Sequence, residues 1–184
     1  MKKKLMLAVI AAACILVIGV GSTIAYFVTI SGPVRNTFTV GDISLTLTET
    51  TGDEYRMIPG TVVSKDPHVT VAGGSEACWL YVKIEGLNGL NDYASYALAD
   101  GWTHLGGFDG VYYRMVEQSA IDTRFQVLKN DQITINATLT EEMMAALNGA
   151  ALPQMKITAY AIQTLGIDDA SDGWYNLMSV YGSD

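Results

Sequence analysis

From residue 36 onward, apolar and polar residues alternate with a period of two. Every second residue is apolar over 42–48 and again over 132–139, which is typical of a strand with one buried and one solvent-facing side. Turn-forming pairs rich in Gly, Pro, Asn and Asp separate these segments. Further strands are predicted over 36–40, 61–65, 68–72, 77–85, 110–116, 124–128 and 155–164. So many short strands predict an all-β fold, a jelly-roll-like β-sandwich.

Two short helices are expected beside the strands. Over 140–149, Thr140 can cap the first turn, and Gly149 can end the helix. The negative charges of Glu141 and Glu142 stabilise the first turn, where the helix dipole is positive. The segment 91–100 is a second candidate, which we expect to cover one end of the sheets. Helix is therefore predicted to be a minor part of this fold.

The N-terminus has a different pattern. Three lysines, Lys2 to Lys4, precede an uncharged apolar stretch over 5–20, and small residues follow up to Ala25. This is the plan of a secretory signal peptide that is cut between Ala25 and Tyr26. It divides the chain into a signal peptide (1–25), an N-terminal segment (26–35) and a β-sandwich domain (36–184).

Two alternatives to cleavage after Ala25 remain open. Residues 5–30 are uncharged and long enough to span a bilayer as an uncleaved anchor. A lipoprotein signal ending at Cys14 is the other, although the apolar stretch before Cys14 is short for one. In each case we expect an exported protein. We expect it to contact a membrane only through a signal segment that stays uncleaved.

The mature part is strongly acidic and has a single cysteine. Loss of Lys2, Lys3 and Lys4 takes the net charge from −8 to −11, which disfavours nucleic acid and anionic lipid as partners, because phosphate contacts need clustered Lys and Arg. Cys78 has no intramolecular partner once Cys14 is removed. It alternates with Leu80 and Val82, so we expect a buried, inert thiol.

Residues that carry catalytic chemistry are sparse. His68 and His104 lie 36 residues apart, and no zinc-binding spacing or nucleophile motif is present. We therefore predict no enzyme activity and no cofactor. Asp168, Asp169 and Asp172 are candidate calcium ligands, because Ca²⁺ prefers oxygen ligands. The alternative is a solvated acidic turn, which we favour because the EF-hand pattern fails here.

The segment 26–35 suggests assembly. Tyr26, Phe27, Val28 and Ile30 make it β-prone, residues 26–34 carry no charged side chain, and a Gly-Pro pair separates it from the first strand. Such a segment can add a strand to an open sheet edge of another molecule. Head-to-tail donation does not close on itself, so it builds a filament. The alternative is an edge strand or a frayed tail of the same domain.

Several short motifs resemble the TasA/camelysin family of biofilm-matrix proteins. The run from Gly21 to Phe27 resembles signal regions cut by the SipW-type signal peptidase of Gram-positive bacteria. The other motifs follow in the family's order and cover nearly the whole chain. They are 38–43, Pro59-Gly60, 65–69, 76–79 and 159–163.

This resemblance implies a secreted subunit that forms a homopolymer in the extracellular matrix or on the cell surface. Its donor would be 26–35, with Tyr26, Phe27, Val28 and Ile30 as the contact residues, and its partner in export would be the SipW-type peptidase. The acceptor edge is not assigned by sequence. Two other functions stay open: a monomeric cell-surface binding module, and a camelysin-like metalloprotease that would use His68 or His104.

Overall fold

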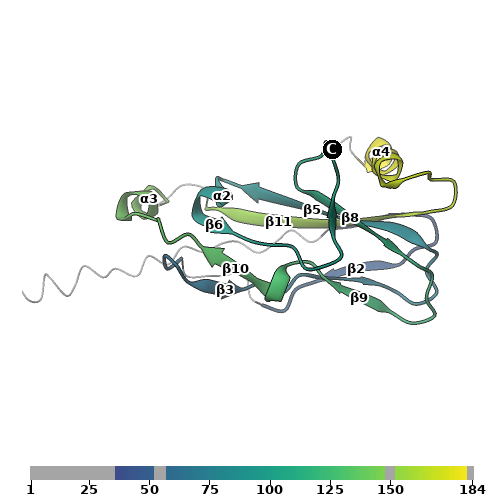
Figure 1. Ribbon diagram of the computed structural model, residues 1–184, viewed down its shortest axis with the longest axis horizontal. Helices are drawn as coiled ribbons and strands as arrows, with labels where there is room; N and C mark the ends of the chain where they lie inside the picture. The colour runs from purple at the N-terminus through teal and green to yellow at the C-terminus, as the bar shows by residue number, and fades with distance from the viewer. Residues whose placement is uncertain (1–35, 52–56, 148–151, 182–184) are drawn as a thin grey trace, which may run out of the picture.

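The computed structural model describes residues 36–51, 57–147 and 152–181. Strands dominate, and they form two layers with a helix on the outside (Figure 1). The all-β prediction is therefore confirmed, and the layers are those of a sandwich. None of the helices within these residues is long and apolar enough to cross a membrane.

The first layer is a five-stranded sheet in the order β1-β11-β5-β8-β7. Its two long central strands pair antiparallel over ten residues each, whereas β1 runs parallel to β11 at one edge. The strands are β1 (Asn36–Val40), β5 (Cys78–Leu87), β7 (Thr103–His104), β8 (Val111–Val116) and β11 (Gln154–Gln163).

The second layer consists of two three-stranded sheets that lie end to end, β3-β10-β6 and β2-β4-β9. They are continuous because the backbone N–H of Lys65 donates to the Asp131 carbonyl, and that of Val127 donates to the Pro67 carbonyl. The strands are β2 (Leu45–Thr48), β3 (Val62–Ser64), β4 (His68–Val71), β6 (Ala94–Ser95), β9 (Thr123–Gln126) and β10 (Gln132–Ile135).

The alternation seen in the sequence fills the space between the layers. On β5, Cys78, Leu80 and Val82 point into this core with no exposed surface. The expectation for Cys78 is confirmed, and burial raises the pKa of its thiol to about 11. At neutral pH this thiol is protonated, so it behaves as a small apolar side chain.

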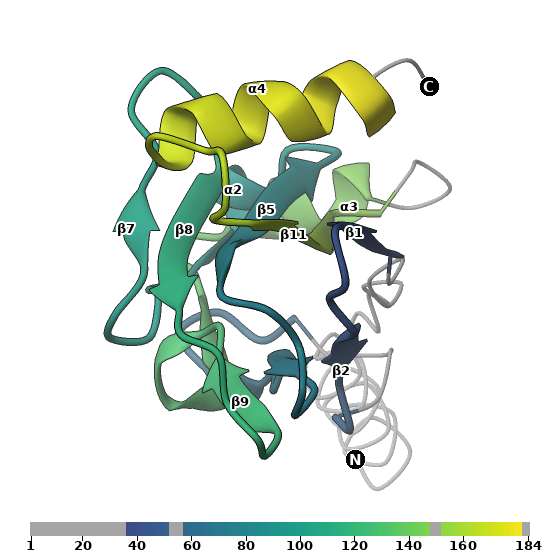
Figure 2. The same ribbon diagram turned by 90° about the vertical axis from the view of Figure 1, so that its right-hand side faces the viewer.

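A helix that the sequence analysis did not anticipate covers the outer face of the five-stranded sheet (Figure 2). This is α4 (Ala170–Tyr181), and its buried residues Ala170, Gly173, Trp174 and Leu177 lie on one face. The Tyr81 hydroxyl donates to the Ala170 carbonyl at 2.7 Å. Tyr81 thereby joins the helix to the centre of the sheet.

The remaining helical turns are short, and the helix expected over 91–100 needs correction. Helix α3 (Glu141–Ala146) begins at the predicted cap, where the Thr140 hydroxyl accepts from the Met143 N–H. Helix α2 (Leu90–Tyr93) occupies only the start of 91–100, because the chain then enters β6. The 3₁₀ turn η1 (Lys129–Asp131) precedes β10.

The strand predicted over 132–139 is also too long. Strand β10 ends at Ile135, and the Asn136 side chain donates to the Asp92 carbonyl at 2.9 Å. The backbone then turns, with the Leu139 N–H directed at the Asn136 carbonyl. Leu139 stays buried, but Ala137 is exposed, so the alternation of buried side chains stops where the ladder of hydrogen bonds does.

Candidate assembly edges

The predicted cleavage and donor residues are not among those that the structure describes. Ala25, Tyr26, Phe27, Val28 and Ile30 all precede Asn36, the first described residue. Their roles therefore stay predictions. The structure does describe the strand edges with which a donated strand could pair.

On the β1 side of the five-stranded sheet, the described strands leave part of β11 without a partner. Strand β1 pairs with β11 only from Thr158 to Ile162, so no described strand pairs with 154–157 on that side. The Thr164 N–H donates to the Ala77 carbonyl, and the alternation along β11 then directs the backbone groups of Met155 away from β5. Met155 itself is 1% exposed, so its side chain lies in the core while its backbone faces the edge.

The second layer has a matching incomplete edge at β3. The Thr61 carbonyl accepts from the Ile135 N–H, and the Lys65 N–H donates to the Asp131 carbonyl. Strand backbone groups alternate in direction, so those of Val62 and Ser64 point away from β10. No other described strand pairs with β3, because β2 pairs only with β4. Val62 is also 57% exposed.

These two edges lie on the same side of the sandwich. Strands β1 and β2 share one flank of the molecule, which is the right-hand side of Figure 2. Both of them cover only part of that flank. The end of the flank beyond these two strands contains β3 and the start of β11, near α3 (Figure 1). We call Val62, Ser64 and Met155 the acceptor edges, since their backbone groups face this flank.

A polar cluster fixes the chain between β2 and β3 next to the acceptor edges. The Lys65 ammonium lies 2.7 Å from a Glu49 carboxylate oxygen, and both side chains are 1% exposed. Such a pair is costly to bury but strongly destabilising to break. The position of β3 relative to β2 is therefore set by an ion pair as well as by apolar packing.

Asp66 adds a second anchor beside this pair. Its carboxylate accepts hydrogen bonds from the backbone N–H and the hydroxyl of both Thr50 and Thr51. Burial alone would raise the pKa of Asp66, but these hydrogen bonds outweigh it and hold the pKa of this carboxyl well below its usual range. At neutral pH Asp66 is thus a fixed anion that holds the loop.

The two histidines lie in different layers. His68 is on β4, where its Nδ1 is 2.9 Å from the Asp66 carbonyl and its Nε2 is 3.8 Å from an Asp131 carboxylate oxygen. The His68 ring is half-buried beside the Asp131 turn. His104 is exposed on β7, and its ring packs edge-on against Tyr112.

The acidic cluster of 168–172 has a structural role at α4. The Asp169 carboxylate accepts from the backbone N–H groups of Ser171 and Asp172, at 2.7 and 3.0 Å, as a helix N-cap does. Asp168 and Asp172 are exposed. Within the described part of the chain, no three His, Cys, Asp or Glu side chains are grouped so as to hold a metal ion.

Comparison with known proteins adds no further constraint. No protein-family model matches the chain, and neither a curated protein nor a solved structure matches it. The family resemblance stays a prediction that rests on the motifs alone. The function must therefore be argued from the segment 26–35 and from the edges that the fold leaves open.

Proposed function

We propose that this protein is a secreted structural subunit that polymerises head-to-tail into extracellular matrix fibres by donation of its segment 26–35. The observation that carries the proposal is the pair of strand edges on one flank, at β3 and at the start of β11, with which no described strand pairs. Unpaired strand edges are templates for another chain unless a protein protects them. Here the strand that would pair with them is supplied by a second subunit.

The chemistry of the segment suits these edges. In strand addition, backbone hydrogen bonds give the affinity and alternate side chains fill apolar sites. The outward backbone groups of Val62, Ser64 and Met155 can form the hydrogen bonds. The donor supplies the apolar side chains, which are those of Phe27, Val28 and Ile30. No charged residue in 26–34 would have to be buried on docking.

The proposed assembly is head-to-tail. Segment 26–35 leads directly into β1, which is itself fixed in the first layer at Asn36–Val40. In this arrangement each subunit gives its segment to one neighbour and receives the segment of another. Contacts of this kind propagate and do not close.

Electron microscopy of two forms of the protein tests the proposal. We expect negatively stained filaments from residues 26–184 and separate particles from residues 36–184. Filaments from both forms would show that the donor segment is not required. Particles from both would contradict self-assembly and favour the monomeric binding module.

The same experiment has an internal control. The free peptide 26–35, added to residues 36–184, should bind without restoring filaments, because it fills the acceptor edges but links no subunits. Filaments that form in the presence of the peptide would contradict donation. Circular dichroism of residues 36–184 establishes that the shortened form remains folded.

A further inference from the structure

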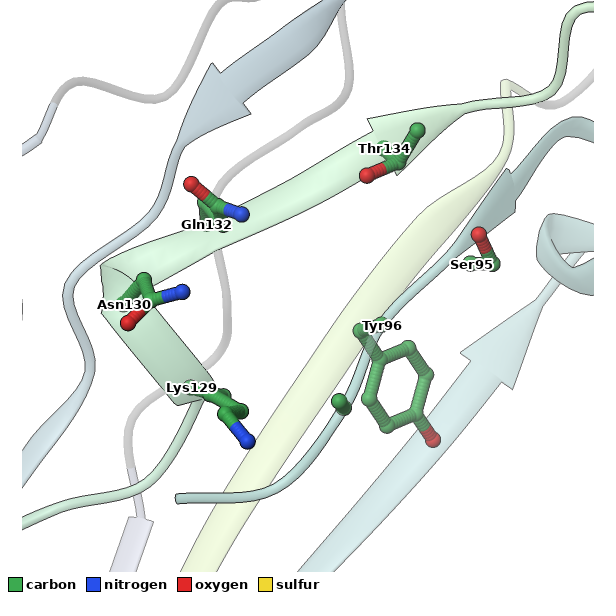
Figure 3. A pocket seen from close by; sticks show the side chains of 7 residues that line it. Ser95, Tyr96, Lys129, Asn130, Gln132 and Thr134 are labelled. Atoms are coloured by element: carbon green, nitrogen blue, oxygen red, sulfur yellow. The ribbon is translucent and has the colours of Figure 1, made fainter.

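A recess opens on the opposite flank of the second layer, away from the acceptor edges. It has a volume of about 260 Å³, just below the usual size of small-molecule sites. Figure 3 shows six of its lining side chains, contributed by β6, η1 and β10 and by the residue after β6. They are Ser95, Tyr96, Lys129, Asn130, Gln132 and Thr134.

An irregular strand pairing creates this recess. Ser95 pairs with Thr134, and the Lys129 N–H donates to the Ala97 carbonyl at 2.9 Å. Tyr96 alone therefore lies opposite residues 130–133. Because segment 129–134 is longer than segment 95–97, it bends away from the shorter segment. Asn130 and Asp131 hold this bend with φ of 57° and 52°, in the left-handed region that residues other than Gly adopt at a cost.

The interruption leaves main-chain polar groups facing the recess. Residues 131, 133 and 135 direct their backbone groups to β3, so the alternation turns those of Gln132 toward β6. The ladder between β10 and β6 stops at Thr134 and Ser95. Gln132 therefore presents an N–H and a carbonyl to the recess in addition to its side-chain amide.

The side chains around the recess are polar, and their one charge is positive. Lys129 and Asn130 are exposed, Gln132 is half-buried, and both amides and the Thr134 hydroxyl are among the lining side chains drawn in Figure 3. Lys129 forms no ion pair with the residues that the structure describes. No carboxylate lines the recess, although the whole chain carries a net charge of −8.

We propose that this recess binds one unit of an acidic saccharide, a uronate whose carboxylate pairs with Lys129. Hydroxyls and amides that can both donate and accept suit the many hydroxyl groups of a sugar. The Tyr96 ring supplies an apolar wall for a C–H face of the sugar. The ammonium adds a charge-assisted hydrogen bond that selects an acidic unit over a neutral one. The site is independent of the proposed strand donation because it uses the other flank.

Equilibrium dialysis with digalacturonate tests the site, since this method works on monomers and filaments alike. The purified protein should bind digalacturonate, and Lys129→Ala should weaken binding by about tenfold, as expected for a lost charge-assisted hydrogen bond. Ala97→Trp, which fills the recess from an exposed position, should abolish binding. Arg124→Ala is the matched control, because it removes the same charge from an exposed position on β9.

Each remaining outcome overturns the proposal. Equal losses in the Lys129 and Arg124 variants would mean general electrostatic attraction. Equal binding of neutral digalactose would refute an acidic ligand, and equal binding of inorganic phosphate would refute a saccharide. Absence of digalacturonate binding would refute the site outright, whether or not filaments form. Unchanged circular dichroism of the variants separates these results from unfolding.

Discussion

The centre of the five-stranded sheet and its β1 flank are built to different degrees of completeness. Strands β5 and β11 pair along their entire length, and Leu80 and Ala159 have no exposed surface. On the flank, β1 pairs with only part of β11, and β2 pairs with β4 but not with β3. The centre is held by its own packing, whereas no described strand pairs with the acceptor edges.

This difference implies that stability and assembly can be separated by mutation. Changes in the centre should unfold the subunit and prevent assembly only for that reason. Changes at the acceptor edges should leave the subunit folded and still prevent assembly. The following predictions run from the largest expected effect on the fold to the smallest.

Leu80→Ala should have the largest effect on the fold. Leu80 is completely buried between the layers, so the substitution removes apolar contacts and leaves a cavity, at a cost of about 3 kcal/mol. Chemical denaturation measures the change. Val62→Ala at the acceptor edge is the control and should cost less than about 0.5 kcal/mol. Similar losses in both variants would contradict the contrast between centre and flank.

Gly173→Ala should destabilise the protein next most strongly. A Cβ at this position would lie 2.3 Å from the Tyr81 hydroxyl oxygen, which is itself held by the Ala170 carbonyl. The helix must then move away from the sheet, at a cost of about 1–3 kcal/mol. Thermal unfolding checks this. Tyr175→Ala, on the exposed face of α4, should have little effect, and the reverse order would contradict the packing of α4.

Asp66→Ala should cost about 1–2 kcal/mol at neutral pH, because it removes hydrogen bonds to a charged group that is partly exposed. The pKa of Asp66 is lower in the folded state than the usual unfolded value of about 3.9. Its contribution is thus complete above that value and is lost as the pH falls below about 4. Denaturation across pH 2–7 should show the two proteins converging at low pH. A constant difference would contradict this role.

Ser64→Pro should have the smallest effect on the fold and a complete effect on filaments. The Ser64 N–H points away from β10, and proline is tolerated on an edge strand where its missing N–H faces outward. Val63→Pro is the contrasting variant, because it removes an N–H that faces β10 and should unfold the layer. Filaments from Ser64→Pro would contradict the acceptor edges, provided that its unfolding midpoint is unchanged.

Much of the strand framework was predictable because one face of each strand is buried. The alternation around Cys78 and Leu80 predicted β5, and Thr140 with its two following acids predicted the start of α3. The end of β10 was wrong because the backbone turns after Ile135, which leaves Ala137 exposed although Leu139 is buried. An alternating sequence does not show where backbone pairing ends.

Helix α4 and the recess were not predicted, for different reasons. Trp174, Leu177 and Tyr181 have the spacing of one helix face, but Gly173 and the acidic run before it suggested a turn. That spacing, together with Asp169 as a cap, was a signal that could have been used. The recess forms because several residues of 129–134 lie opposite Tyr96 alone. The order of residues along one strand does not show how many residues of a partner strand will lie opposite it. The acceptor edges depend on strand pairing in the same way.

A mixing experiment tests the central claim of strand donation most directly. Residues 36–184 can accept but not donate, and residues 26–184 with Ser64→Pro can donate but have lost the outward N–H of β3 that acceptance requires. Light scattering coupled to size-exclusion chromatography should find each alone as a monomer and the mixture as a one-to-one dimer. A mixture that stays monomeric, or either form polymerising alone, would contradict the proposed assembly.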